Sequence, residues 1–165
     1  MRTYPIVYYP TPILNKRSSV ITQITEEWQA LVPDMVKTMH ENEGIGLAAP
    51  QINIPKRLVI VRDAKEDLAF FNAQIVSKSR ETDVQEEGCL SLPGIFIPIK
   101  RAKSITVKAQ LPDGNTIEMK AEGMTARIFQ HEIDHLNGFL IINRVSPLAR
   151  FRLRKELREF KKQNR

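Results

Sequence analysis

The chain has 165 residues, 42% of them apolar and 27% charged, and its 25 lysines and arginines exceed its 19 acidic residues to give a net charge of +6. A chain of this length and apolar content suits one globular domain, which excludes wholesale disorder. No apolar run approaches the roughly 20 residues of a membrane-spanning helix, so we expect no membrane partner.

The positive charge is concentrated near the C-terminal end of the sequence. Residues 144–165 contain nine basic and two acidic side chains, whereas residues 1–143 contain 16 basic and 17 acidic ones. A nearly neutral body does not fit a nucleic-acid-binding domain that is basic throughout. The single cysteine, Cys89, cannot form an intrachain disulfide, and the N-terminal segment does not resemble a signal peptide, so we expect a cytoplasmic protein.

The first part of the chain is predicted to hold one helix. Several prolines favour irregular structure over residues 1–24. A helix is then expected to begin at Glu26, because apolar residues recur at helical spacing from there to Met39. Pro33 is expected to kink or divide this helix, and Gly44 is expected to end it.

The rest of the chain is predicted to combine short strands with helices. Four segments have strand character: Arg57–Val61, Ala69–Val76, Ser104–Ala109 and Thr116–Lys120. The last two flank a Pro-Asp-Gly-Asn turn at 112–115 and are predicted to form a hairpin. We expect a helix at Glu122–Leu136, a short apolar strand at Phe139–Ile142 and a C-terminal helix over residues 147–163. Several strands around a central helix predict an α+β fold, with residues 1–165 as one domain.

A sharper signal lies in the predicted second helix, which contains His-Glu-Ile-Asp-His at residues 131–135. Histidines at positions i and i+4 fall on one face of a helix and can hold one metal ion, and Glu132 can reach a water bound to that ion. The pattern favours a metal-dependent hydrolase, in which three protein ligands leave one position open for water or substrate.

The third ligand decides the class of this metal site. The third histidine of a metzincin is absent because residue 141 is isoleucine, whereas Glu156 lies near the spacing of a thermolysin-like ligand. Cys89, in the segment Glu-Gly-Cys-Leu-Ser, offers a thiolate instead. From the residues alone both candidates remain open, and a buried core cysteine is a further interpretation of Cys89.

A third segment, Gly-Ile-Gly-Leu-Ala-Ala-Pro-Gln at residues 44–51, combines small residues with one amide. Small residues let the backbone approach a ligand closely, and Gln51 can donate a hydrogen bond. The segment lacks the lysine and hydroxyl residue of a phosphate-binding loop, which argues against phosphate binding.

Together, and in this order, the three motifs resemble those of peptide deformylase, over essentially the whole chain. The resemblance implies an α+β fold with antiparallel sheets around the helix that carries the histidines. It also implies that Cys89, His131 and His135 hold one divalent metal, natively Fe(II), which Zn, Ni or Co can replace. Glu132 would be the general acid/base.

The resemblance further assigns contacts to the substrate. Gln51 and the backbone N–H of Leu90 would stabilise the oxyanion. Glu43 and Arg101 match positions that form an ion pair in the family. Three more positions would contact the formyl group or the peptide: Ile45, Gly46 and Gly88.

The implied reaction is removal of the N-formyl group from the N-terminal methionine of newly synthesised proteins, with release of formate. The alternatives are a zincin-type metalloprotease that uses Glu156 and a ribosome- or RNA-binding homologue without catalytic activity. Some bacterial deformylases dock at the ribosome through a C-terminal helix, and here the basic helix is expected to pack an apolar stripe on the body and expose a basic one. The expected partners are therefore N-formyl-methionyl nascent peptides and the ribosome, in the bacterial cytoplasm.

Overall fold

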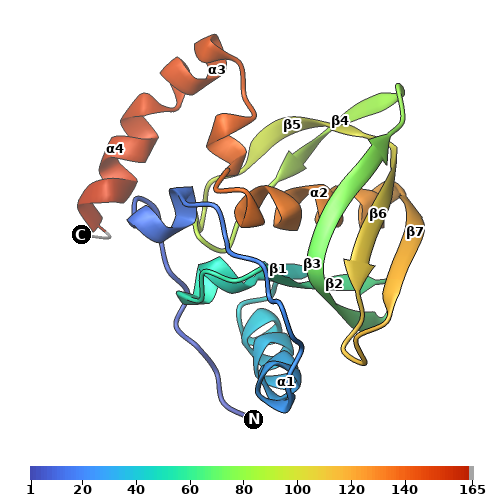
Figure 1. The fold of residues 1–165 in the computed structure, drawn as a ribbon. Coiled ribbons are helices and arrows are strands. Elements are labelled where there is room, and N and C mark those ends of the chain that lie inside the picture. Colours follow the sequence, from blue (N-terminus) through green and yellow to red (C-terminus); the bar gives the residue numbers. More distant parts are fainter. Residues whose placement is uncertain (164–165) are drawn as a thin grey trace.

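Figure 1 shows the fold of the chain, for which the computed structural model describes residues 1–163. The four α-helices of this part are α1 (Glu26–Glu41), α2 (Gly123–Leu136), α3 (Pro147–Arg152) and α4 (Arg154–Gln163). Three short 3-10 helices are η1 (Pro12–Asn15), η2 (Ala49–Ile52) and η3 (Ile141–Asn143). Arg165, the last cation of the basic segment, lies outside the described residues.

The strands form two antiparallel sheets, which gives the α+β fold that the sequence predicts. The larger sheet has the order β1-β2-β3-β6-β7, and the smaller one pairs β4 with β5. The strands are β1 (Gly46–Ala48), β2 (Leu58–Asp63), β3 (Glu66–Lys78), β4 (Thr82–Glu87), β5 (Ile97–Ala102), β6 (Ser104–Gln110) and β7 (Thr116–Glu122). The expected hairpin around 112–115 is present as the β6–β7 pair.

Helix α2 lies in the centre of the molecule, between the two sheets (Figure 1). Its apolar residues pack on one face of the larger sheet, where Phe129 meets Phe70 with ring centroids 4.9 Å apart. Strand β2 is buried on both faces, because Val59 and Val61 join the cluster around α2 while the alternate residues join the cluster under α1. This period of two explains why β2 is a continuous apolar run.

Three predicted details differ in the structure. Residues 139–142 do not form a strand: the chain turns into η3 at Ile141, and the side chains of Leu140, Ile141 and Ile142 pack into a cluster that includes η1 and β5. Pro33 does not divide α1, because Leu31 and Met35 on either side of it are buried in the same cluster and hold the helix as one element. The sequence also left β1, β4 and β5 unpredicted.

The C-terminal segment folds back onto the body at one side of the molecule (Figure 1). It forms two consecutive helices rather than one, with the break at Leu153. Leu157 and Phe160 of α4 are buried in the same cluster as η3, as the expected apolar stripe requires. None of the helices in residues 1–163 has the length and apolar character that crossing a bilayer demands.

Candidate metal centre and active site

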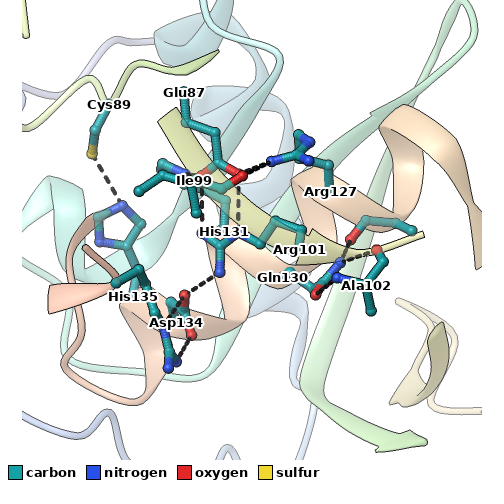
Figure 2. Close-up of polar contacts among 12 residues, drawn as sticks. Glu87, Cys89, Ile99, Arg101, Ala102, Arg127, Gln130, His131, Asp134 and His135 are labelled. Carbon is teal, nitrogen blue, oxygen red and sulfur yellow. Dashed lines mark hydrogen bonds and ion pairs between the residues drawn. The ribbon is translucent and has the colours of Figure 1, made fainter. Parts of the chain in front are cut away.

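Three side chains with metal-ligating atoms converge beside the buried C-terminal half of the central helix. His131 and His135 project from one face of α2, and Cys89 follows the end of β4. Their ligand atoms all lie within 4.8 Å of one another, and Cys89 Sγ is 3.2 Å from His135 Nε2 (Figure 2). Within residues 1–163 this is the one such group of three or more. Two imidazoles and a thiolate suit a first-row transition metal, so these residues fit a divalent ion.

The orientation of His131 is fixed by a buried carboxylate. Its Nδ1 lies 3.0 Å from Glu87 Oε2, so Nδ1 carries the proton and Nε2 is left as the ligand atom. Glu87 also accepts hydrogen bonds from Arg101 and Arg127 (Figure 2). Burial alone would raise the pKa of Glu87, but the hydrogen bonds from His131 and Arg101 outweigh it and lower the pKa to about 2. Glu87 is therefore ionised and holds the imidazole ring in place.

His135 is kept in the form that a metal requires. Burial lowers the pKa of His135 well below its usual range. Its Nδ1 is buried and has no hydrogen-bond partner among the described residues. A neutral imidazole with its Nε2 beside the thiol of Cys89 is the state in which histidine binds metals.

Glu132 is a buried carboxylate that the fold leaves with an unused oxygen. Its side chain is only 4% exposed, and Oε2 has no hydrogen-bond partner in the described part of the chain. Burial raises the pKa of Glu132 to about 7. A Cβ atom at Gly46 would lie 2.4 Å from Glu132 Oε1, so only glycine fits there. A carboxyl group with such a pKa beside a metal site is suited to accept and return a proton.

Two hydrogen-bond donors also lie next to Cys89, on Gln51 and on Leu90. The N–H of Ala48 donates to Gln51 Oε1 at 2.9 Å, which turns the amide nitrogen of Gln51 toward Cys89 Sγ at 3.7 Å and Ser91 Oγ at 3.3 Å. The backbone N–H of Leu90 donates no hydrogen bond to another of residues 1–163. Two donors are thus available to a negatively charged oxygen beside the ligand cluster.

A cavity of about 550 Å³ leads to this cluster. Of the residues that the sequence singled out, those in its lining are Ile45, Gly46, Gln51, Gly88, Cys89, Leu90, His131 and Glu132. Two large apolar side chains of its lining, Phe96 and Met124, remain more than half exposed. A Cβ atom at Gly88 would lie 2.8 Å from the Phe96 ring, so that ring lies against the Gly88 backbone. The cavity suits an extended chain with apolar side chains.

The expected ion pair between Glu43 and Arg101 is absent from the described residues. Arg101 is buried and instead binds Glu87 through two N–H groups and Asp134 through a third. Glu43 lines the cavity and adopts a positive φ of 57°. The prediction was wrong because a buried guanidinium needs buried carboxylates, which lie on β4 and α2.

Two further residues, Glu156 and Arg127, differ from what the sequence suggested about the site. Glu156 is exposed on α4 and is not among the residues that converge with the histidines. Arg127, which sequence reasoning missed, donates to Glu87 and to Asp83 and is almost fully buried. Its position four residues before His131 places it on the face of α2 that carries both histidines, and that spacing was the available signal.

This arrangement is typical of a class of protein, the metal-dependent hydrolases: an H-E-x-x-H helix and a distant cysteine bring together three side chains that could hold a metal ion, beside a buried carboxyl group. The polypeptide deformylase family model matches residues 3–151. The peptide deformylase of Thermotoga maritima is 44% identical over 154 residues, which cover 93% of this chain and 94% of that protein. The chain therefore belongs to the peptide deformylase family.

Solved structures agree with this assignment. The crystal structure of the Thermotoga maritima peptide deformylase superimposes with a TM-score of 0.86 at 43% identity and covers 89% of this chain and 100% of that one. The structure of the Ehrlichia chaffeensis peptide deformylase in complex with actinonin has a TM-score of 0.92 at 34% identity and covers 100% and 99% of the two chains.

Proposed function

We propose that Cys89, His131 and His135 hold the metal ion of a deformylase and that Glu132, Gln51 and Leu90 carry its chemistry. The family sets the reaction: a metal-dependent hydrolase removes the N-formyl group from the N-terminal methionine of newly synthesised proteins and releases formate. The observation that carries the residue roles is the convergence of one thiol and two imidazoles within 4.8 Å beside a buried carboxyl group.

The metal ion, when bound, supplies a Lewis acid that polarises the formyl carbonyl and makes a water molecule more acidic. Fe(II) is the native ion in this proposal, with Zn, Ni or Co able to replace it. A thiolate and two imidazoles accept all four ions, because each of them binds both sulfur and nitrogen ligands.

The protein's own groups then move the proton and hold the charge. Glu132 takes a proton from the attacking water as the water oxygen adds to the formyl carbon. The oxyanion that develops accepts hydrogen bonds from Gln51 Nε2 and from the Leu90 N–H. Glu132 delivers its proton to the departing nitrogen, the C–N bond breaks, and formate and a free amino terminus are the products.

The size of the acyl group is limited by the same residues. Gly46 lies so close to Glu132 that even a methyl group in place of its hydrogen would collide with the carboxylate. Formyl is the smallest acyl group, so a site this narrow accepts formyl and excludes acetyl on steric grounds. Ile45 and Gly88 line the cavity beside it and are the proposed contacts for the peptide.

The test of the ligand set uses two variants. Cys89→Ala should lose both bound metal and formate release, because a tetrahedral site with only two protein ligands binds weakly. Glu156→Ala, the matched control, should keep both. Metal content is measured by mass spectrometry, and activity by formate release from a formyl-methionyl peptide. Loss of both in Glu156→Ala but not in Cys89→Ala would point to a zincin-type site.

We also propose that the C-terminal helices dock the enzyme at the ribosome of a bacterial cytoplasm, where nascent chains emerge. Three cations, Arg150, Arg154 and Arg158, are exposed and form no ion pair with any of residues 1–163. They line a second hollow of about 220 Å³ together with Tyr9 and Lys161. A surface rich in phosphate would neutralise this cluster.

Ribosome pelleting at low salt tests the docking proposal. Replacing the three arginines by alanine should weaken binding and flatten its dependence on salt. The control replaces three exposed, unpaired lysines of the body: Lys65, Lys78 and Lys108. Equal losses in the two triple variants would show that net charge alone, and not this surface, governs binding.

A further inference from the structure

Among residues 144–163, Arg144 is the one that joins the polar contacts around the proposed metal centre. It follows η3, and its Nε donates to Asp134 Oδ2 at 2.9 Å while Nη2 donates to Asp134 Oδ1. Its guanidinium also lies 4.9 Å from the centroid of the Phe139 ring. A two-pronged contact with a stacked ring fixes a guanidinium in one orientation.

Asp134 also accepts a hydrogen bond from a second arginine, Arg101. The carboxylate lies between the two histidines in the sequence, and its Oδ2 also accepts a hydrogen bond from Arg101 Nη1 at 2.5 Å (Figure 2). Arg101 donates its other two hydrogen bonds, from Nε and Nη2, to the carboxylate of Glu87, with both N···O distances at 2.9 Å. Glu87 in turn accepts from His131 Nδ1 at 3.0 Å. A continuous chain of charged hydrogen bonds therefore runs from Arg144 to His131.

The inner members of the chain lie where such bonds are strong. The side chains of Arg101 and Glu87 are each 5% exposed, and that of Asp134 is 11% exposed. Charged hydrogen bonds in so little water depend closely on the position of each partner. By contrast, the side chain of Arg144 is 39% exposed, so it can be replaced without opening a cavity in the core.

The way the bonds are shared explains what Arg144 contributes. Because Arg144 binds both oxygens of Asp134, the carboxylate needs only one N–H of Arg101. Arg101 is then free to present Nε and Nη2 together to Glu87. Without Arg144, Asp134 would have Arg101 as its only cationic partner among residues 1–163 and would draw that guanidinium away from Glu87.

We infer that Arg144 is a positioning residue for the metal centre, acting on His131 through Asp134, Arg101 and Glu87. The inference rests on the proposed ligand set. A residue that contacts a metal ligand directly changes metal affinity by about 10–100-fold when it is lost. Arg144 lies further along the chain, so its removal should have a smaller effect of the same kind.

The test follows Co(II) in the whole protein. We expect Arg144→Ala to release Co(II) to a chelator about 3–10-fold faster than the wild-type protein, a smaller effect than that of a direct partner. Its visible Co(II) absorption spectrum should shift, because the geometry of His131 changes. Arg144→Lys should have a Co(II) release rate between those of Arg144→Ala and the wild-type protein, since lysine keeps the positive charge but cannot donate two hydrogen bonds from one planar group. Arg152→Ala, which removes an exposed arginine that forms no ion pair with any of residues 1–163, should behave as wild type.

Three results would overturn the inference. One is an Arg144→Ala protein with the wild-type release rate and spectrum. Another is an Arg144→Ala protein that is less stable to urea yet keeps the wild-type spectrum, which would mark a purely structural role. If Arg144→Ala does not fold, an Arg144→Lys protein identical to wild type would be the third. A wild-type chain that takes up no Co(II) would instead overturn the proposed ligand set on which the inference rests.

Discussion

Arginines serve opposite purposes in the body and in the C-terminal helices of this molecule. In the body, Arg101 and Arg127 are almost fully buried, and each is bound to two carboxylates. On α3 and α4, Arg150 and Arg158 are exposed and pair with no acidic group of residues 1–163. The comparison teaches that the buried charges hold the fold and the His131 ring in place, whereas the exposed charges remain available to a partner.

The largest effect on activity should come from replacing Glu132, the proposed general base. Replacing Glu132 with glutamine keeps the shape of the side chain but removes the base, so formate release should fall by about 10²–10⁴-fold. Metal content should remain at the wild-type level, because Glu132 is not a proposed ligand. Formate release and metal analysis on the same preparation check both points. If the glutamine variant retained more than a tenth of the wild-type activity, Glu132 would not be the general base.

The buried arginines should matter for stability where the exposed ones do not. Arg101→Met leaves Glu87 and Asp134 buried with fewer partners, and it should lower the free energy of unfolding by about 3–5 kcal/mol. Arg150→Met is the matched control and should change it by less than about 0.5 kcal/mol. Urea titration followed by circular dichroism measures both. Equal effects at the two positions would break the comparison between the two regions.

Replacing Gly46 should show how little space lies between its backbone and the side chain of Glu132. A Cβ atom there would collide with Glu132 and with Ile128, so Gly46→Ala should displace the carboxylate. Formate release should fall by up to about 100-fold, which is the cost of misplacing a reacting group by roughly 1 Å. Gly114→Ala strains a turn with a φ of 88° but lies outside the cavity lining, so it controls for a general loss of stability. The two variants should differ widely in kcat and little in solubility.

The smallest expected effect concerns the thiolate ligand. Cys89 bound to Fe(II) is open to oxidation, because thiolates react stepwise to sulfenic and sulfonic acids. Iron-loaded protein kept in air should therefore lose activity several-fold faster than nickel-loaded protein. The half-lives under air and under argon measure this, and mass spectrometry of the peptide that contains Cys89 should show added oxygen. Identical half-lives for both metals would count against the role of the thiolate.

The elements with strong periodicity could be predicted from the sequence, and those held by tertiary contacts could not. Helices α1 and α2 follow from apolar spacing. Strand β4, with the sequence Thr-Asp-Val-Gln-Glu-Glu, is acidic and mostly exposed, so nothing local marks it as a strand. It is held by pairing with β5 and by the arginines that bind Asp83 and Glu87.

The site shows the same division. The histidine motif was evident because its residues are neighbours on one helix. Cys89 is distant in the sequence, so the residues alone left it open against Glu156; the family resemblance selected it, and the fold places it beside the histidines. The partners of Arg101 were missed for the same reason. Its carboxylates lie on β4 and α2, far apart in the sequence, and only burial of all three groups together selects them over Glu43.

The central claim is that the site hydrolyses a formyl group next to an N-terminal methionine. Its most direct test compares N-formyl- and N-acetyl-methionyl peptides of the same sequence, with nickel-loaded protein of measured metal content. We predict formate release from the formyl peptide that depends on the metal, and no acetate release from the acetyl peptide. No formate release from fully loaded protein, or equal hydrolysis of the two peptides, would contradict the account.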